Sequence, residues 1–368
     1  VVSRARVAMA PVAGLPPGSS RWVEAVRLLP ADYLVTAGRD PHTAAALQIV
    51  LGVTLFVAVL GLCLDDRHVV RRVALVVGLV GVAAALATVV AVPGRYWQTG
   101  DTNELIRYFV ATRSRYAFHL LDVNAAGSHF ILGLLLVLGL AVERKRRGWM
   151  WGSLAVTTMA LWICGSRAAM AAGVGLVLVG GLGARVVAAG LRWPQMSSRV
   201  LGAAGVLVLV GLSLSPTVIG SAGATTGSAS RSLSVREEFL VTSVRMISTA
   251  PMSGVGVGTY LQRSNAFMPP GLRALYGREN AHNYFMQTVA ELGIVGIVAF
   301  LWWLGAVLGR MWRQIAPDGS LTLSLGLFLG VMAFLVTCVT GHPFLVVEAS
   351  IPFWAALGAG ASETAKVY

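Results

Sequence analysis

The sequence predicts an all-α fold, a polytopic bundle of transmembrane helices with one long loop outside the membrane. Two observations predict this class. Of the 368 residues, 56% are hydrophobic and 12% are charged, whereas a soluble domain carries about twice that share of charge. The apolar residues also gather in segments of about 20, which is the length that crosses a bilayer as a helix.

About nine such segments follow one another, and a break at Gly165-Ser166 divides one long apolar stretch into a tight hairpin with Arg167 at its turn. The predicted spans are 44–64, 73–92, 124–142, 149–165, 168–184, 200–220, 288–308, 320–340 and 347–362. They divide the chain into an extracytoplasmic segment 1–43, transmembrane helices within 44–220, a long extracytoplasmic loop 221–287, and C-terminal transmembrane helices within 288–368. Because the chain starts at Val1 without a signal-peptide pattern, we expect further sequence upstream, including further spans.

The charges of the loops predict the orientation. Basic loops follow the first, third, fifth and seventh spans, and the positive-inside rule places all four in the cytoplasm. Their basic residues are Arg67, Arg71, Arg72, Arg144, Lys145, Arg146, Arg147, Arg185, Arg192, Arg199, Arg310 and Arg313. The net charge of +13 is therefore explained by topology signals and contacts with anionic lipids, and no nucleic-acid partner is expected.

Few ionisable side chains lie in the spans, and those few lean toward the predicted extracytoplasmic end. They are His129, Glu291 and Glu348. A charge inside a membrane is costly, so such residues indicate a functional site.

Cys63, Cys164 and Cys338 lack metal-ligand spacing and are expected to be small buried hydrophobic residues, and no metal or other cofactor is predicted.

The long loop contains a predicted surface helix. Ser234 and Glu237 fit a capping box, which places Arg236 in the first turn of the helix, and Pro251 ends the pattern. A guanidinium at a helix N-terminus can hold a phosphate group. Contact with lipid headgroups is the alternative interpretation of Arg236.

The glycine-rich run 254–258 that follows lacks a preceding strand, so it predicts a tight turn and no nucleotide site.

A polar cluster leads into the seventh span. One of the asparagines of this cluster, Asn280 or Asn283, is expected to cap the helix, with His282 at or just before its first turn. Asn283, Gln287 and Glu291 form a stripe at intervals of four. Glu291 lies about 13 Å deeper than His282, too far to orient its ring, so pairing with a buried donor is expected. A lone histidine at the edge of a membrane is usually structural. Further polar residues are predicted on the same side of the membrane as His282 and favour a functional site there. They are Asp122, Asn124, His342 and Glu348.

These motifs resemble those of the O-antigen ligase and O-antigen polymerase superfamily. The resemblance covers roughly 93–362 and rests on short motifs in a common order. They are Asp122-Val123-Asn124, Gly165-Ser166-Arg167-Ala168-Ala169, Gly254-Val255-Gly256-Val257-Gly258-Thr259-Tyr260, Ala281-His282-Asn283-Tyr284-Phe285-Met286-Gln287-Thr288-Val289-Ala290-Glu291-Leu292-Gly293, and the hairpin His342 to Glu348. The family fold has about twelve spans, so the resemblance implies two or three further helices before Val1.

The resemblance implies a ligase-type glycosyltransferase of the cell inner membrane. It would move a glycan from undecaprenyl diphosphate to a lipid A-core acceptor on the periplasmic side, with inversion and without a metal. The family's essential histidine maps onto His282, as a general base, and its two essential arginines map onto Arg167 and Arg236, as diphosphate ligands. Asn124 and Asn283 are expected to bind substrate, and Glu291, His342 and Glu348 to support the site. Such a transfer requires a general base and fixed positive groups that bind the diphosphate, and an imidazole and two guanidinium groups can supply them.

Two alternatives stay open at this point. A polymerase of O-antigen or capsular polysaccharide would share the donor and the mechanism and differ in its acceptor, a second lipid-linked repeat. A transporter or flippase for the same lipid-linked sugar belongs to another class, and such proteins bind near the bilayer midplane. The predicted midplane carries almost no ionisable residue, which favours the enzyme. A membrane scaffold would not require Arg167 in its hairpin.

Overall fold

A computed structural model describes residues 41–64, 66–99, 117–120, 122–143, 147–188, 227–315 and 323–362. Within these ranges all regular secondary structure is helical. The helices are α3 (Pro41–Cys63), α4 (Arg67–Thr99), α6 (Val123–Glu143), α7 (Arg147–Cys164), α8 (Arg167–Ala188), α11 (Gly227–Thr249), α12 (Tyr260–Phe267), α13 (Pro270–Tyr276), α14 (Tyr284–Arg313), α15 (Leu323–Cys338), the 3-10 helix η3 (Pro343–Leu345) and α16 (Val347–Ser362).

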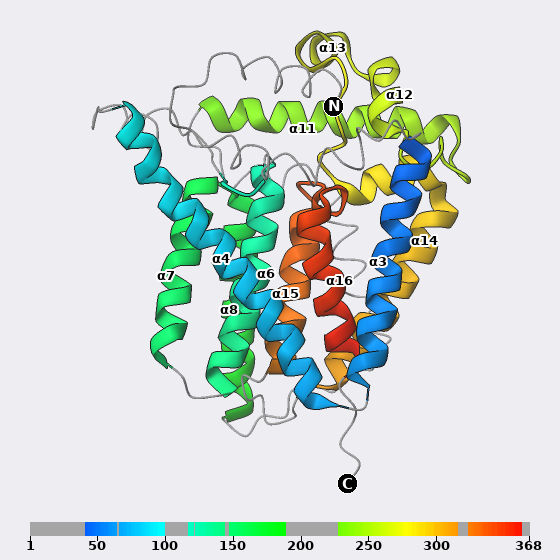
Figure 1. The fold of residues 1–368 in the computed structure, drawn as a ribbon. Coiled ribbons are helices and arrows are strands. Elements are labelled where there is room, and N and C mark those ends of the chain that lie inside the picture. Colours follow the sequence, from blue (N-terminus) through cyan, green and yellow to red (C-terminus); the bar gives the residue numbers. More distant parts are fainter. Residues whose placement is uncertain are drawn as a thin grey trace.

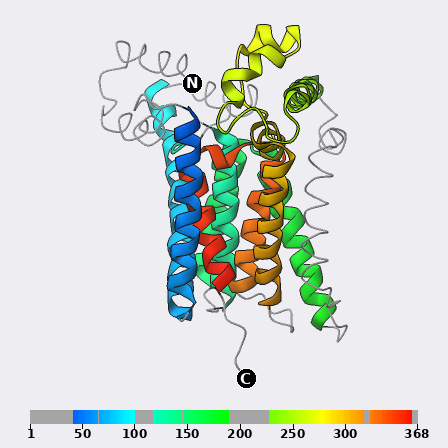
Figure 2. The same ribbon diagram turned by 90° about the vertical axis from the view of Figure 1, so that its right-hand side faces the viewer.

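The long apolar helices stand side by side as a bundle, and α11 lies across one end of it (Figure 1). α12 and α13 lie at the same end, above the bundle when it is turned by 90° (Figure 2). The start of α3, the end of α4, the start of α6, the α7–α8 turn and the start of α14 also lie at this end (Figure 1). These are the helix ends that the loop charges predict to be extracytoplasmic, and we refer to this end as the α11 end.

Helix α6 forms the centre of the bundle, with contacts to α4, α7, α8, α15 and α16. Its residues from Ala125 to Val137 are all buried. The close approach of α4 to α6 depends on Gly81 and Gly133, because a Cβ on either would lie 2.9 Å from the Cα of the other. Small residues let membrane helices pack at this distance, where dispersion rather than the hydrophobic effect holds them together.

The predicted spans coincide well with the described helices, apart from the span predicted at 200–220, which lies outside the described residues together with most of segment 1–43. By length and composition, α3, α4, α6 and α14 can each cross a membrane, and α7 and α15 contain shorter apolar helices. The hairpin at Gly165 is confirmed, since α7 ends at Cys164, Gly165 has a φ of 62°, and α8 begins at Arg167. The total of about nine crossings stays a prediction.

The predicted start of the surface helix is wrong. Helix α11 begins at Gly227, so Ser234 lies inside the helix and does not cap it, and Arg236 lies near its middle. A capping-box pattern marks where a helix can start, but serines and an alanine upstream tolerate helical geometry and the helix extends through them. The unpaired backbone N–H groups of a first turn therefore do not assist Arg236. The predicted stop is confirmed, because α11 ends at Thr249, just before Pro251.

Candidate active site

His282 lies immediately before α14 at the α11 end. Asn283 caps the helix, as expected, because its side chain accepts a hydrogen bond of 3.1 Å from the backbone N–H of Met286. His282 itself has a φ of 51°, the one positive φ among the described residues other than glycine. A left-handed conformation is unfavourable for most side chains, and such residues persist where the surroundings hold them and gather at functional sites.

A second histidine contacts the ring of His282. The ring centroids of His282 and His342 are 5.2 Å apart, with the planes inclined by 52°. His342 Nε2 lies 3.3 Å from Asp122 Oδ2, and the two side chains are 11% and 24% exposed. The ring of His282 also packs against Phe239 of α11, at a centroid distance of 5.0 Å. The tertiary structure therefore brings Asp122, His342 and His282 together from three separate segments.

An aromatic contact and a backbone hydrogen bond align the two histidines. Tyr284, two residues after His282, stacks on Phe344, two residues after His342, with ring centroids 4.7 Å apart. The backbone N–H of Tyr284 donates to the carbonyl of Gly341 over 3.0 Å. Phe344 is anchored in turn by edge contacts with Phe334 and Phe353. The start of α14 and the turn before α16 are thus held in register.

A chain of buried polar groups fixes the backbone that precedes His282. Gln287 accepts a hydrogen bond from the N–H of Ala281 and donates to the side chain of Asn280. It also donates to Glu291 over 3.2 Å. Gln287 and Glu291 are 3% and 8% exposed, so the polar stripe of α14 faces the protein interior, as expected. Hydrogen bonds of Gln287 fix the backbone before His282, and the Asn283 cap fixes the backbone after it. His282 therefore has little freedom to relax from its left-handed conformation.

The glycine-rich run packs into a break in α14. Gly293 has a φ of 68° and a ψ of −173°, so the helical hydrogen bonds stop there. The free carbonyls of Ala290 and Glu291 accept from the N–H groups of Val255 and Gly256 instead, and Ile294 N–H donates to the carbonyl of Pro251. Buried backbone N–H and C=O groups need hydrogen-bond partners. The hydrogen bonds between the glycine-rich run and α14 supply partners for the groups that the break in the helix leaves free. The run is therefore a turn, in agreement with the sequence analysis.

Glu291 ties this turn to α14 through its side chain. Its carboxylate accepts hydrogen bonds from the backbone N–H groups of Gly258 and Tyr260, over 2.8 and 3.1 Å. It does not contact His282, and its link to that residue runs through Gln287. The carboxylate thus pairs with buried donors.

Arg236 lies on α11, the helix that contacts the ring of His282. Phe239, which contacts His282, lies three residues further along α11, and residues at this spacing share a face of a helix. Phe239 is 1% exposed and packs with Met268 and Leu272, so this face of α11 is anchored against the segment that leads to His282. Arg236 is partly buried.

Arg167 starts α8 at the same end of the bundle. The preceding Ser166 is buried against α6, where a Cβ on Gly127 would overlap its side chain. Arg167 itself is exposed. Asn124, one turn before Gly127, lies beside Gly341, the neighbour of His342. α6 therefore connects the Arg167 turn with the histidine pair, while the arginine itself makes none of the ring contacts.

The remaining ionisable groups lie apart from the ring contacts of His282. One carboxylate oxygen of Glu348, at the start of α16, is buried and has no hydrogen-bond partner within the described ranges. His129 Nδ1 lies 3.2 Å from Nε2 of His119, a residue that the sequence analysis did not single out. Burial lowers the pKa of His119 to about 4, so this imidazole is neutral at physiological pH.

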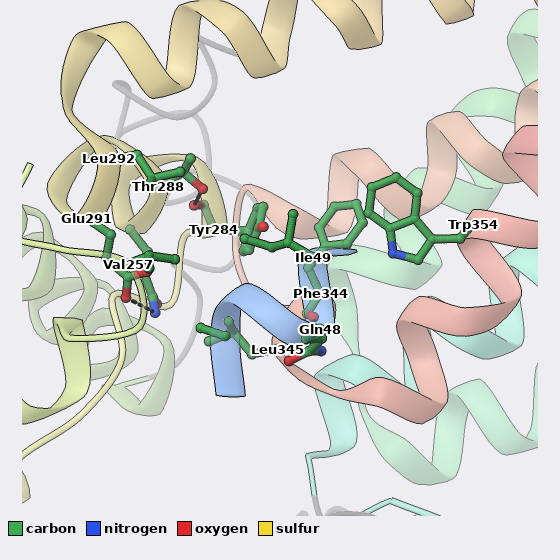
Figure 3. Close-up of a pocket in the computed structure, with 12 residues that line it drawn as sticks. Gln48, Ile49, Val257, Tyr284, Thr288, Glu291, Leu292, Phe344, Leu345 and Trp354 are labelled. Atoms are coloured by element: carbon green, nitrogen blue, oxygen red, sulfur yellow. Dashed lines mark hydrogen bonds between the residues drawn. The ribbon is translucent and has the colours of Figure 1, made fainter. Parts of the chain in front are cut away.

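A small cavity of about 50 Å³ borders the start of α14. Figure 3 shows its lining residues, which come from α3, the glycine-rich run, α14, the η3 turn and α16. Glu291 and Gln287 make one part of the lining polar, and Phe344 and Trp354 make another part aromatic. The cavity has room for a few water molecules. His282 does not line it, so the cavity is not the centre of the candidate site.

The described residues contain no group of three or more histidine, cysteine, aspartate or glutamate side chains arranged to hold a metal ion. Cys63, Cys164 and Cys338 are buried, as the sequence analysis expected, and none of the three forms a disulfide with another described cysteine. The arrangement at the α11 end instead offers an imidazole in a strained backbone position, a carboxylate–imidazole pair in contact with it, and two arginines, one at the start of α8 and one on α11. Such a set can accept a proton and bind an anion.

Fold and site together define an all-α, multi-pass membrane protein whose polar groups gather at one end of the bundle. The chain belongs to the O-antigen ligase family, because the model of the family described as O-Antigen ligase matches residues 105–301, more than half of the chain. The match spans Arg167, Arg236 and His282. The function is therefore of the O-antigen ligase or polymerase type in general. A comparison with curated proteins found no match.

Proposed function

We propose that this protein transfers a glycan from undecaprenyl diphosphate to the hydroxyl group of a lipid A-core acceptor, at the periplasmic side of the inner membrane. The observation that carries the proposal is His282, held in a left-handed conformation and in ring contact with the Asp122–His342 pair. The left-handed backbone of His282 has no evident structural role. A catalytic base whose ring must keep one orientation would explain why this conformation is maintained.

In the proposed reaction His282 takes the proton of the acceptor hydroxyl, and the oxygen attacks the anomeric carbon of the donor sugar. The bond from that carbon to the diphosphate oxygen breaks, undecaprenyl diphosphate leaves with the electron pair, and the anomeric configuration inverts. The donor already carries a good leaving group, so the step requires no nucleotide. An imidazole is a suitable base because its ordinary pKa lies near neutral pH.

Arg167 and Arg236 are the proposed ligands of the diphosphate. Each guanidinium offers paired N–H donors in a planar fork that matches phosphate oxygens, and the charge of the arginine persists at any physiological pH. Both lie at the α11 end, on α8 and α11. Negative charge grows on the diphosphate as the glycosidic bond breaks, and fixed positive groups stabilise it without a metal. Asn124 and Asn283 are proposed to contact the substrate, and Glu291, His342 and Glu348 to support the site.

Arg236→Lys is expected to weaken donor binding and to slow transfer together, because an ammonium group cannot make the paired contact. The assay uses purified protein in EDTA, an undecaprenyl diphosphate-linked glycan and lipid A-core, and measures donor affinity and product. Arg245→Lys is the matched control, since nine residues along α11 place Arg245 on the opposite face of the helix, where it is exposed.

Three results would contradict this proposal. If Arg245→Lys impairs binding as much as Arg236→Lys, the loss is a general effect of replacing an arginine in α11 and does not indicate a diphosphate contact by Arg236. If EDTA abolishes transfer and magnesium restores it, the reaction depends on a metal. If a second lipid-linked repeat is accepted and lipid A-core is not, the protein is a polymerase of the same family.

Cysteines introduced at the two ends of the bundle should test the proposed orientation. Ser248 is exposed on α11 and His68 is exposed at the start of α4, at the opposite end. In intact spheroplasts an impermeant maleimide is expected to label Ser248→Cys and to label His68→Cys only after lysis. The three native cysteines are buried, so their background labelling should be low. The reverse pattern would place the α11 end in the cytoplasm, where the proposed transfer cannot occur.

A further inference from the structure

The carboxylate of Asp122 has two separate tasks. Its Oδ1 caps α6 by accepting hydrogen bonds from the N–H groups of Asn124 and Ala125, over 2.8 and 3.2 Å. Its Oδ2 lies 3.3 Å from Nε2 of His342. A cap needs only one oxygen, and Ser or Asn supplies it about as well as Asp. The second oxygen is therefore available for His342.

This contact determines which nitrogen of His342 carries the proton. A carboxylate only accepts hydrogen bonds, so Nε2 must be the N–H that donates to it. Nδ1 of His342 is buried and has no hydrogen-bond partner within the described ranges. A proton on Nδ1 would be an unsatisfied buried donor, which costs free energy. The geometry thus favours the tautomer with the proton on Nε2 and the lone pair on Nδ1.

We propose that Asp122 is a positioning residue for the glycan transfer, acting through His342 on the proposed base His282. This inference rests on the proposed function. The His342 ring lies against His282 at a centroid distance of 5.2 Å, and the Asp122 carboxylate contacts Nε2 of His342. When His282 takes the proton of the acceptor hydroxyl it becomes an imidazolium. A fixed negative charge and an imidazole with a free lone pair stabilise that cation in a partly buried site.

Asp122→Asn separates the two tasks of the carboxylate. Asparagine still caps α6 through its oxygen, but its NH₂ group then faces Nε2 of His342 and can only donate. The imidazole must respond by moving its proton to Nδ1, and the negative charge is lost at the same time. In a serine-protease triad the same Asp→Asn change puts the catalytic histidine itself in the wrong tautomer and lowers kcat about 10⁴-fold with the geometry intact. Here the carboxylate acts on the histidine beside the base, so a smaller loss is expected.

The experiment measures kcat and the KM for the donor in Asp122→Asn, with Asp66→Asn as the matched control. Asp66 caps α4 in the same way, since its Oδ1 accepts from the N–H of His68 over 2.7 Å, at the opposite end of the bundle. We expect Asp122→Asn to lower kcat about 10²-fold or more with little change in KM, and Asp66→Asn to match the wild type. His342→Ala should lower kcat similarly, and adding Asp122→Asn to it should cause little further loss.

Wild-type kcat in Asp122→Asn, or losses that multiply in the double variant, would overturn the inference and leave Asp122 as a helix cap. If Asp122→Asn does not fold, Asp122→Ser decides the matter, because serine retains the cap oxygen and removes the contact with His342. Failure of the proposed function is distinguishable, since the wild type itself would then not transfer glycan, or His282→Ala would transfer it at the wild-type rate. The tautomer is tested without turnover by ¹⁵N NMR of histidine-labelled protein in liposomes, with His342→Ala for assignment. A proton on Nδ1 in the wild type would contradict the inference.

Discussion

His282→Ala is expected to lower the rate of glycan transfer by about 10²–10⁴ while donor binding stays nearly intact. The reason is that His282 is proposed to act only when the proton leaves the acceptor hydroxyl, whereas the arginines bind the diphosphate before that step. Donor affinity and the single-turnover rate, measured on the same preparation, separate the two effects. Loss of donor binding with unchanged chemistry per bound donor would make His282 a phosphate ligand.

A backbone control is needed because His282 has a φ of 51°. Alanine is disfavoured in the left-handed region, whereas asparagine is one of the few residues that adopt it readily. His282→Asn should therefore keep the turn before α14 and remove only the basic nitrogen. We expect His282→Asn to be as slow as His282→Ala and to melt at the temperature of the wild type. An active His282→Asn would show that the backbone conformation matters and that the imidazole does not.

Gly293→Ala is expected to abolish the folded protein or to destabilise it severely. Gly293 combines a φ of 68° with a ψ of −173°, a region that is essentially restricted to glycine and that costs other residues about 1–3 kcal/mol. A Cβ at this position would also overlap the carbonyl group of Met252. The glycine-rich run would have to leave the break in α14, and the buried hydrogen bonds between them would be lost. Yield after detergent extraction and the melting temperature measure the effect.

Gly61→Ala is the matched control for this substitution. Gly61 lies in α3, another membrane-spanning helix, and a Cβ there would meet no atom within 4 Å. Alanine is the better helix former, so Gly61→Ala should melt at or slightly above the wild-type temperature. If Gly293→Ala behaves in the same way, the break in α14 is dispensable and the glycine-rich run is not held by it.

The sequence alone determined the class of the protein and the place of its polar groups along the chain. Span length and loop charge predicted helices that coincide with α3, α6, α7, α8 and α16, because a bilayer sets the length of an apolar helix directly. An asparagine of the cluster before α14 was predicted as a cap and Glu291 as a residue paired with buried donors; Asn283 is the cap, and the hydrogen bonds of Glu291 agree. Both predictions depend on spacing along one helix, which is a local property.

Only the tertiary structure decided which of these groups meet. The contact of His342 with His282 and with Asp122 joins segments more than 50 residues apart in the sequence, and no periodicity relates them. The insertion of the glycine-rich run into α14 is equally invisible in the sequence, because it depends on carbonyls that become free when Gly293 breaks the helix. The start of α11 was predicted wrongly, since a capping pattern cannot say whether the residues before it continue the helix. Spacing along one helix is written in the sequence, whereas contact between helices depends on how their surfaces pack.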